Sequence, residues 1–97
     1  MPSVLVIDDE PDVRDSIRQV LNRVGFDVAT ADNGEAGIKA FYGQPPDVVI
    51  VDIIMPRRNG VEVIKEIRES FPGARIVAIT GGGNFGPPAI VAAWILL

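Results

Sequence analysis

The segment Asp-Val-Val-Ile-Val-Asp-Ile-Ile-Met-Pro, residues 47–56, constrains the fold more than any other part of the sequence. Four β-branched residues, Val48 to Val51, run without interruption into Asp52, and Pro46 and Pro56 stand on either side. An apolar run of this length indicates a strand that is buried on both faces, as in a parallel sheet. Asp52 should therefore lie at the carboxyl edge of that sheet, where ligands bind in open α/β folds.

A second apolar run, Pro-Ser-Val-Leu-Val-Ile at residues 2–7, ends in the same way, in Asp8, Asp9 and Glu10. If the two strands are parallel neighbours, the carboxylates of Asp8, Asp9 and Asp52 converge on one small volume. Three carboxylates in one crevice repel one another unless they are protonated or neutralised by a cation. A set of oxygen ligands suits a hard cation such as Mg²⁺ or Mn²⁺. We interpret Glu10 as a solvated residue of the first helical turn rather than a ligand.

Composition narrows the chemistry that this chain can perform. The 97 residues include no cysteine and no histidine, which excludes disulfides, thiolate metal sites and a histidine general base. The net charge of −4 argues against binding to nucleic acid. The N-terminus has no signal-peptide pattern, and the apolar run at the C-terminus, nine residues, is too short to span a membrane. We therefore expect a cytoplasmic protein with no membrane partner.

Hydrophobic periodicity predicts strands and helices in strict alternation. Strands are expected at residues 4–7, 26–31, 47–52 and 75–80, and helices at residues 11–24, 35–42 and 61–71. The predicted apolar stripe of the first helix consists of Val13, Ile17, Val20, Leu21 and Val24, and that of the third includes Val61, Ile64, Ile67 and Phe71. Alternation with short connections implies one domain with a parallel sheet and right-handed crossovers.

Three short motifs lie at the predicted strand ends: Val-Ile-Asp-Asp-Glu at 6–10, Val-Asp-Ile-Ile-Met-Pro at 51–56 followed by Gly60, and Ile-Thr-Gly at 79–81. In order and spacing they resemble the signatures of the receiver domains of response regulators, and the resemblance covers residues 3–81. It implies a flavodoxin-like, doubly wound α/β fold with a parallel sheet of strand order 2-1-3-4.

The resemblance also implies roles for individual residues. Asp52 matches the phosphoacceptor of the family, and Asp8 and Asp9 match the acidic pair that holds a divalent metal ion, Mg²⁺ or Mn²⁺. The backbone carbonyl of Ile54 matches a further metal ligand, and Thr80 matches the hydroxyl that turns towards the phosphoryl group. The implied partner is a histidine kinase or a phosphotransfer protein.

The C-terminal part departs from the family pattern. A full receiver continues through a fourth helix, a fifth strand with a Lys-Pro pair and a final helix, and neither Lys39 nor Lys65 matches that lysine. We expect a core over 1–81, a Gly/Pro linker over 82–88 and an apolar segment over 89–97. This segment is predicted to form a helix that packs in a homodimer interface, so that the sheet ends at its fourth strand. The alternative is that it folds back entirely, as a surrogate strand beside Thr80, and gives a compact monomer.

Two functions remain open at this point. The first is a signalling receiver that is phosphorylated on Asp52. The second is a shortened receiver that acts as a metal-binding dimerisation or assembly module without phospho-switching. A hydrolase of the haloacid-dehalogenase kind also uses a strand-end aspartate, but the downstream elements that it requires have no room in 97 residues.

Overall fold

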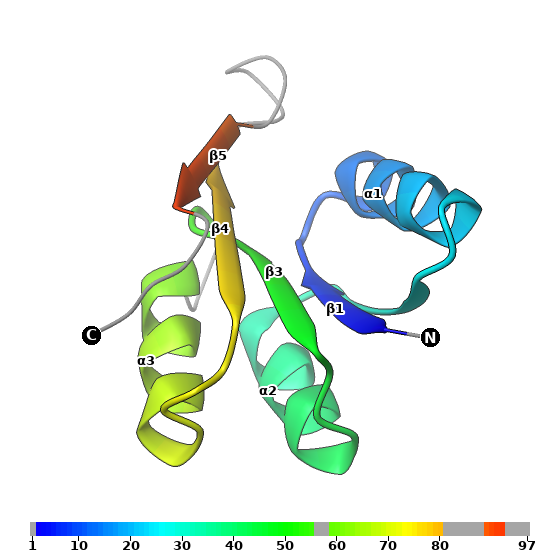
Figure 1. Ribbon diagram of the computed structural model, residues 1–97. Helices are drawn as coiled ribbons and strands as arrows, with labels where there is room; N and C mark the ends of the chain where they lie inside the picture. The colour runs from blue at the N-terminus through cyan, green and yellow to red at the C-terminus, as the bar shows by residue number, and fades with distance from the viewer. Residues whose placement is uncertain (1, 56–58, 81–88, 93–97) are drawn as a thin grey trace.

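The computed structural model describes residues 2–55, 59–80 and 89–92, which form one sheet with helices on both faces (Figure 1). The strands are β1 (Ser3–Ile7), β2 (Asp27–Ala31), β3 (Val48–Asp52), β4 (Ile76–Thr80) and β5 (Ala89–Ala92). The helices are α1 (Pro11–Arg23), α2 (Gly34–Gly43) and α3 (Gly60–Ser70).

The sheet has the order β2-β1-β3-β4-β5, and its first four strands are parallel. The flavodoxin-like order 2-1-3-4 that the sequence predicts is confirmed. β1 and β3 lie in the middle of the sheet, as their uninterrupted apolar runs require, and Leu5, Ile7, Val49 and Val51 are each no more than 2 % exposed.

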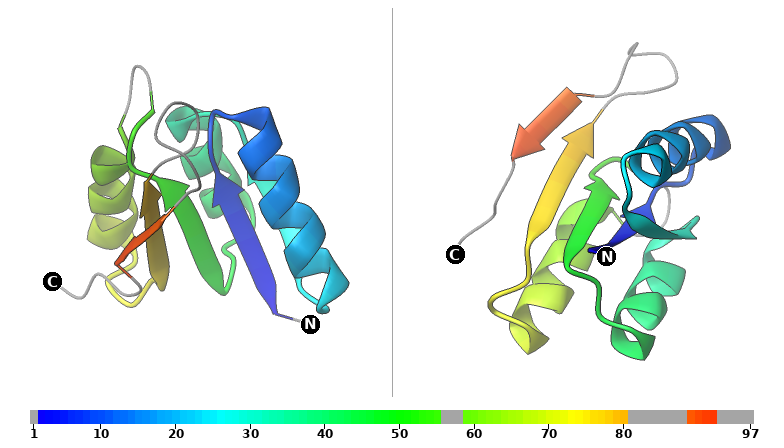
Figure 2. Two further views of the ribbon diagram at one scale, coloured as in Figure 1. Left: turned by 90° about the horizontal axis from the view of Figure 1, so that it is seen from above. Right: turned by 45° about the vertical axis from the view of Figure 1, so that its right-hand side comes forward.

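The helices divide unequally between the two faces of the sheet. α2 and α3 cover one face together, whereas α1 lies on the other (Figures 1 and 2). The main core lies under α2 and α3, where Ile38 and Phe41 of α2 and Val63 and Ile67 of α3 pack against β1, β3 and β4. α1 has no buried residue, and Val20 and Val24 are 57 % and 66 % exposed. The apolar stripe predicted for α1 is therefore only partly covered by the described residues.

Helices α2 and α3 each begin after an asparagine N-cap, which sets the residue at which the helix starts. The side chain of Asn33 accepts a hydrogen bond from the amide of Ala36 (2.8 Å), and that of Asn59 accepts one from Glu62 (3.0 Å). The stripe predicted for α3 needs two corrections. Val61 is 48 % exposed and Val63 is fully buried in its place, and Phe71, which follows the last residue of the helix, is 38 % exposed. The cause of the first is that α3 begins with Gly60 packed against β3, which turns Val63, Ile64 and Ile67 towards the core.

The structure also corrects the prediction for the C-terminal segment. Residues 89–92 do not begin a helix: they form β5, which pairs antiparallel with β4 so that Thr80 lies opposite Ala89 and Ile79 opposite Ile90. Without β5, β4 would present a row of unpaired backbone groups at the edge of the sheet, and the β-branched pair Ile90 and Val91 favours a strand. The alternative of a surrogate strand beside Thr80 is thus confirmed for Ala89–Ala92. The predicted linker 82–88 and residues 93–97 lie outside the described residues.

No helix within the described ranges has the length and hydrophobicity needed to cross a membrane.

Candidate functional site

The parallel pairing of β1 with β3 brings two acidic strand ends together. Ile7 lies opposite Val51, so the next residues, Asp8 just after β1 and Asp52 at the end of β3, lie side by side at the same edge of the sheet. Asp8, Asp9 and Asp52 can each present one carboxylate oxygen such that these oxygens lie within 4.8 Å of one another. Asp8 and Asp52 are only 1 % and 4 % exposed, and Asp9 is half-buried. The convergence predicted from the sequence is confirmed for all three carboxylates.

Backbone amides orient the two buried carboxylates. Oδ1 of Asp8 accepts a hydrogen bond from the amide of Glu10 (2.9 Å), and Oδ1 of Asp52 accepts one from the amide of Ile54 (3.0 Å). In both cases the donor lies two residues later, the local geometry by which aspartate stabilises a turn at the end of a strand. Each carboxylate thus closes the turn that follows its own strand.

The electrostatics of the site make it costly for all three groups to be ionised together. Burial raises the pKa of Asp52 from 3.8 to about 6; the Ile54 amide opposes this change, and the charges of Asp8 and Asp9 add to it. Burial also raises the pKa of Asp8, against the opposing effect of its hydrogen bond from Glu10. A divalent cation would relieve this repulsion, because it favours the ionised form of each carboxylate that it binds.

The connection from β3 to α3 depends on Gly60, which the sequence associates with the loop after Asp52. A Cβ atom at Gly60 would overlap the backbone carbonyl of Asp52 and would lie 2.7 Å from Cα of Ile53. The Gly60 amide donates to the Ile53 carbonyl (2.8 Å), which closes the loop tightly onto the end of β3. A residue without a side chain is therefore needed here, so that α3 can start next to the acidic cluster.

The remaining site residues from the sequence are placed only in part. Asp52 lies opposite Ile79 in the pairing of β3 with β4, so the backbone of Thr80 is one position further along the neighbouring strand. The side chain of Thr80 lies outside the described part of the structure. Ile54 follows the site with a 60 % exposed side chain, and the role of its carbonyl as a ligand stays a prediction.

The sequence reasoning missed one residue next to the site. The guanidinium of Arg14 donates to the backbone carbonyl of Asp8, with 2.8 Å between Nη1 and the oxygen. From the sequence, Arg14, Arg18 and Arg23 all appear equally as residues outside the apolar stripe of α1. The only available signal was the position of Arg14 in the first turns of the helix that follows the acidic pair.

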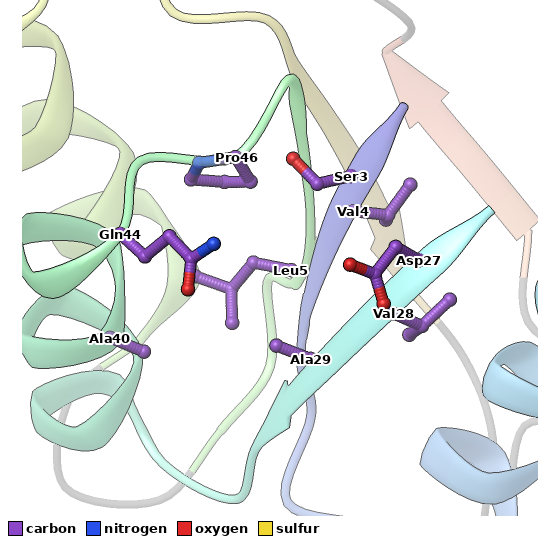
Figure 3. Close-up of a pocket in the computed structure, with 9 residues that line it drawn as sticks. All are labelled: Ser3, Val4, Leu5, Asp27, Val28, Ala29, Ala40, Gln44 and Pro46. Atoms are coloured by element: carbon purple, nitrogen blue, oxygen red, sulfur yellow. The ribbon is translucent and has the colours of Figure 1, made fainter. Parts of the chain in front are cut away.

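A hollow of about 310 Å³ lies at the opposite edge of the sheet, where β1 and β2 begin (Figure 3). Its lining is mixed and includes Ser3, Leu5, Asp27, Ala29 and Gln44. Asp27 is the one charged residue among the described residues that line it, so the hollow is not a second cluster of carboxylates like the one at the carboxyl ends of the strands.

A parallel sheet of order 2-1-3-4, with three carboxylates converging after its first and third strands, defines a receiver domain. The model of the response regulator receiver domain family matches residues 4–93, and the chain belongs to this family.

Relatives and solved structures agree with this assignment. The chain is 35 % identical over 82 residues to the chemotaxis protein CheY of Thermotoga maritima, matching 84 % of this chain and 68 % of that one. It is 35 % identical over 78 residues to the probable transcriptional regulatory protein TcrX of Mycobacterium tuberculosis, matching 80 % of this chain but only 33 % of TcrX. The chain thus spans about one third of the length of that regulator.

Among solved structures, the response regulator TrrA of Thermotoga maritima in complex with Mg²⁺ and BeF superposes with a TM-score of 0.81 and 38 % identity. The match covers 89 % of this chain and 75 % of TrrA. TrrA in complex with the histidine kinase ThkA gives a TM-score of 0.79, again at 38 % identity, over 90 % of this chain and 75 % of TrrA.

The buried charge predicts how stability depends on pH in the metal-free protein. Because the pKa of Asp52 is raised to about 6 in the folded state, its ionisation between about pH 4 and pH 7 destabilises the fold. The free energy of unfolding should therefore fall across this range. Asp52→Asn should escape this loss and should exceed the parent at pH 7 by on the order of 1–3 kcal/mol.

Denaturation in EDTA between pH 4.5 and 7.5 measures this difference. Asp27→Asn, which removes an exposed carboxylate at the start of β2, is the matched control and should follow the parent profile. If the free energy of unfolding changes with pH in the same way in the parent and in Asp52→Asn, the charge of Asp52 does not destabilise the fold.

Proposed function

We propose that this receiver domain accepts a phosphoryl group on Asp52 with the help of a divalent cation, Mg²⁺ or Mn²⁺, held by Asp8, Asp9 and Asp52. The single observation that carries this proposal is the convergence of these three carboxylates within 4.8 Å. A Mg²⁺ complex of TrrA and a kinase complex of the same relative support it. A histidine kinase or a phosphotransfer protein would be the phosphodonor.

The residues divide the chemistry between them. A carboxylate oxygen of Asp52 attacks the phosphorus atom, an acyl phosphate bond forms, and the bond to the donor's leaving group breaks. With its pKa near 6, Asp52 is mostly ionised at neutral pH, as a nucleophile must be. A divalent cation held by these carboxylates would neutralise charge on the transferring phosphoryl group, where electrostatic stabilisation is usually the largest contribution. In this proposal the Ile54 carbonyl would be a further ligand, and the Thr80 hydroxyl would contact the phosphoryl oxygens.

This function makes the domain a signalling module rather than an enzyme that turns over a substrate. Its cytoplasmic location, and the absence of nucleic-acid and membrane partners, stay predictions from the sequence.

Phosphorylation is tested by incubation with a small phosphodonor and Mg²⁺, followed by intact-mass measurement. One phosphoryl group should be added to the parent and none to Asp52→Asn. Asp47→Asn, at the exposed start of the same segment, is the control and should be labelled like the parent. Lys39 and Lys65 lie on exposed positions of α2 and α3, so we expect slower labelling than in a receiver with a lysine at the site. Label that persists in Asp52→Asn would refute the assignment.

A second candidate function is that of a metal-binding assembly module that forms a homodimer through residues 89–97 and does not switch. The observation that favours it is that, among the described residues, β5 is an edge strand of the sheet. Residues 76–97 contain no charged residue, so this edge lacks the charges that usually oppose pairing between strands of two molecules. A two-fold axis beside β5 would pair it with the same strand of a second copy.

The assembly is tested by light scattering at micromolar concentration, where we expect the mass of a dimer. Val91→Lys should dissociate it, because lysine in an edge strand opposes pairing. Val24→Lys places the same substitution at the exposed C-cap residue of α1, and this variant should remain a dimer. A monomeric parent would exclude the assembly, and dissociation by Val24→Lys alone would move the interface to α1.

A further inference from the structure

Helix α1 is less completely buried than α2 and α3 and lacks the side-chain cap that both of them have. Its N-cap residue, Glu10, makes no side-chain capping bond, whereas α2 and α3 are capped by Asn33 and Asn59. α1 buries no residue completely, while α2 and α3 bury four each. Because α1 begins shortly after Asp8 and Asp9, movement of its first turns would change the orientation of these two carboxylates.

Arg14 links the first turns of α1 to the end of β1. Its half-buried side chain reaches back from α1, and Nη1 donates to the Asp8 carbonyl at 2.8 Å. The other hydrogen-bonding groups of Asp8 are also held, since its amide donates to the Ala31 carbonyl (3.1 Å) and its Oδ1 accepts from Glu10 (2.9 Å). Of these bonds, only the one from Arg14 ties the end of β1 to the body of α1.

We propose that Arg14 is a positioning residue of the cation site: its guanidinium fixes the turn between β1 and α1, so that Asp8 and Asp9 point at the same cation as Asp52. This inference rests on the proposed binding of Mg²⁺ or Mn²⁺ by the three carboxylates. Arg14 itself touches neither the cation nor the phosphoryl group in this account.

Two physical effects of Arg14 oppose each other, which makes the sign of a substitution informative. Its positive charge repels a divalent cation, so by charge alone its removal would tighten metal binding. Its hydrogen bond orients the turn, so by geometry its removal would weaken metal binding. Mg²⁺ demands near-ideal octahedral geometry, and loss of a group that orients its ligands typically costs 10–100-fold in affinity. Repulsion from a half-exposed guanidinium is reduced by solvent, so the geometric effect should dominate.

The matched control for Arg14 lies one turn further along the same helix. Arg18 carries the same charge but pairs on the surface with Asp15, at 3.2 Å, and both side chains are substantially exposed. Arg14→Met and Arg18→Met therefore change the net charge equally, and only the first removes a bond to the site.

The experiment is a titration of each variant with MgCl₂ at pH 7, followed by the backbone amide chemical shifts of residues 8–10 and 52–54, with thermal stability in EDTA measured in parallel. We expect Arg14→Met to weaken Mg²⁺ binding about 10–100-fold. Arg18→Met should bind within about twofold of the parent, because exposed charges contribute little. Arg14→Lys keeps the charge and a donor and should recover part of the loss.

The outcomes separate this inference from the function on which it rests. A parent that binds no Mg²⁺ overturns both. A parent that binds, with Arg14→Met binding equally or more tightly, overturns the positioning role and leaves the proposed function standing. Equal weakening in Arg14→Met and Arg18→Met also overturns it, since net charge would then be the cause. If Arg14→Met does not fold in EDTA, Arg14→Gln, whose shorter neutral side chain also loses the bond, decides by the same criteria.

Discussion

The parallel pairing of β1 with β3 is the interaction on which the rest of the site depends. Ile7 opposite Val51 places Asp8 and Asp52 at the same height on the same edge of the sheet. A slip by one residue would displace one carboxylate by about 3.3 Å and turn it to the other face. The register is held by apolar side chains that are buried on both strands, Leu5 and Ile7 against Val49 and Val51. The chemistry at the edge is thus specified by packing in the core.

The same packing sets the balance between stability and function. The packing that holds the two strands in register also shields Asp8 and Asp52 from solvent. Loss of solvent raises the pKa of both carboxyl groups. A metal-free receiver therefore carries unfavourable charge at neutral pH, which a cation would relieve. Ligand binding of this kind adds to folding stability, because the site exists only in the folded chain. The turns after β1 and β3 hold the carboxylates in place despite their mutual repulsion. The Glu10 and Ile54 amides close these turns, and Gly60 lets the loop after β3 pack closely against the strand end.

The sequence predicted those features that local pattern and strand order determine, and it failed where tertiary contacts decide. The four parallel strands and the cluster of Asp8, Asp9 and Asp52 follow from apolar runs that end in acids. The segment after Pro88 is apolar all round, so periodicity cannot distinguish helix from strand there; the open edge of β4 selects a strand for Ala89–Ala92. Val61 and Val63 are equally apolar, and only the docking of Gly60 on β3 decides which one is buried. Arg14 looks like any other arginine of its helix until the fold brings it to Asp8.

The central claim is that Asp8, Asp9 and Asp52 form one cation site. Anomalous diffraction from crystals soaked in Mn²⁺ tests it most directly, since the ion's position is located without reference to a ligand model. The account predicts one strong peak between the ends of β1 and β3, with carboxylate oxygens of this cluster at about 2.0–2.3 Å, and no such peak in Asp52→Asn. Peaks confined to exposed carboxylates such as Asp12 or Asp15, or a peak at the cluster that persists unchanged in Asp52→Asn, would contradict it.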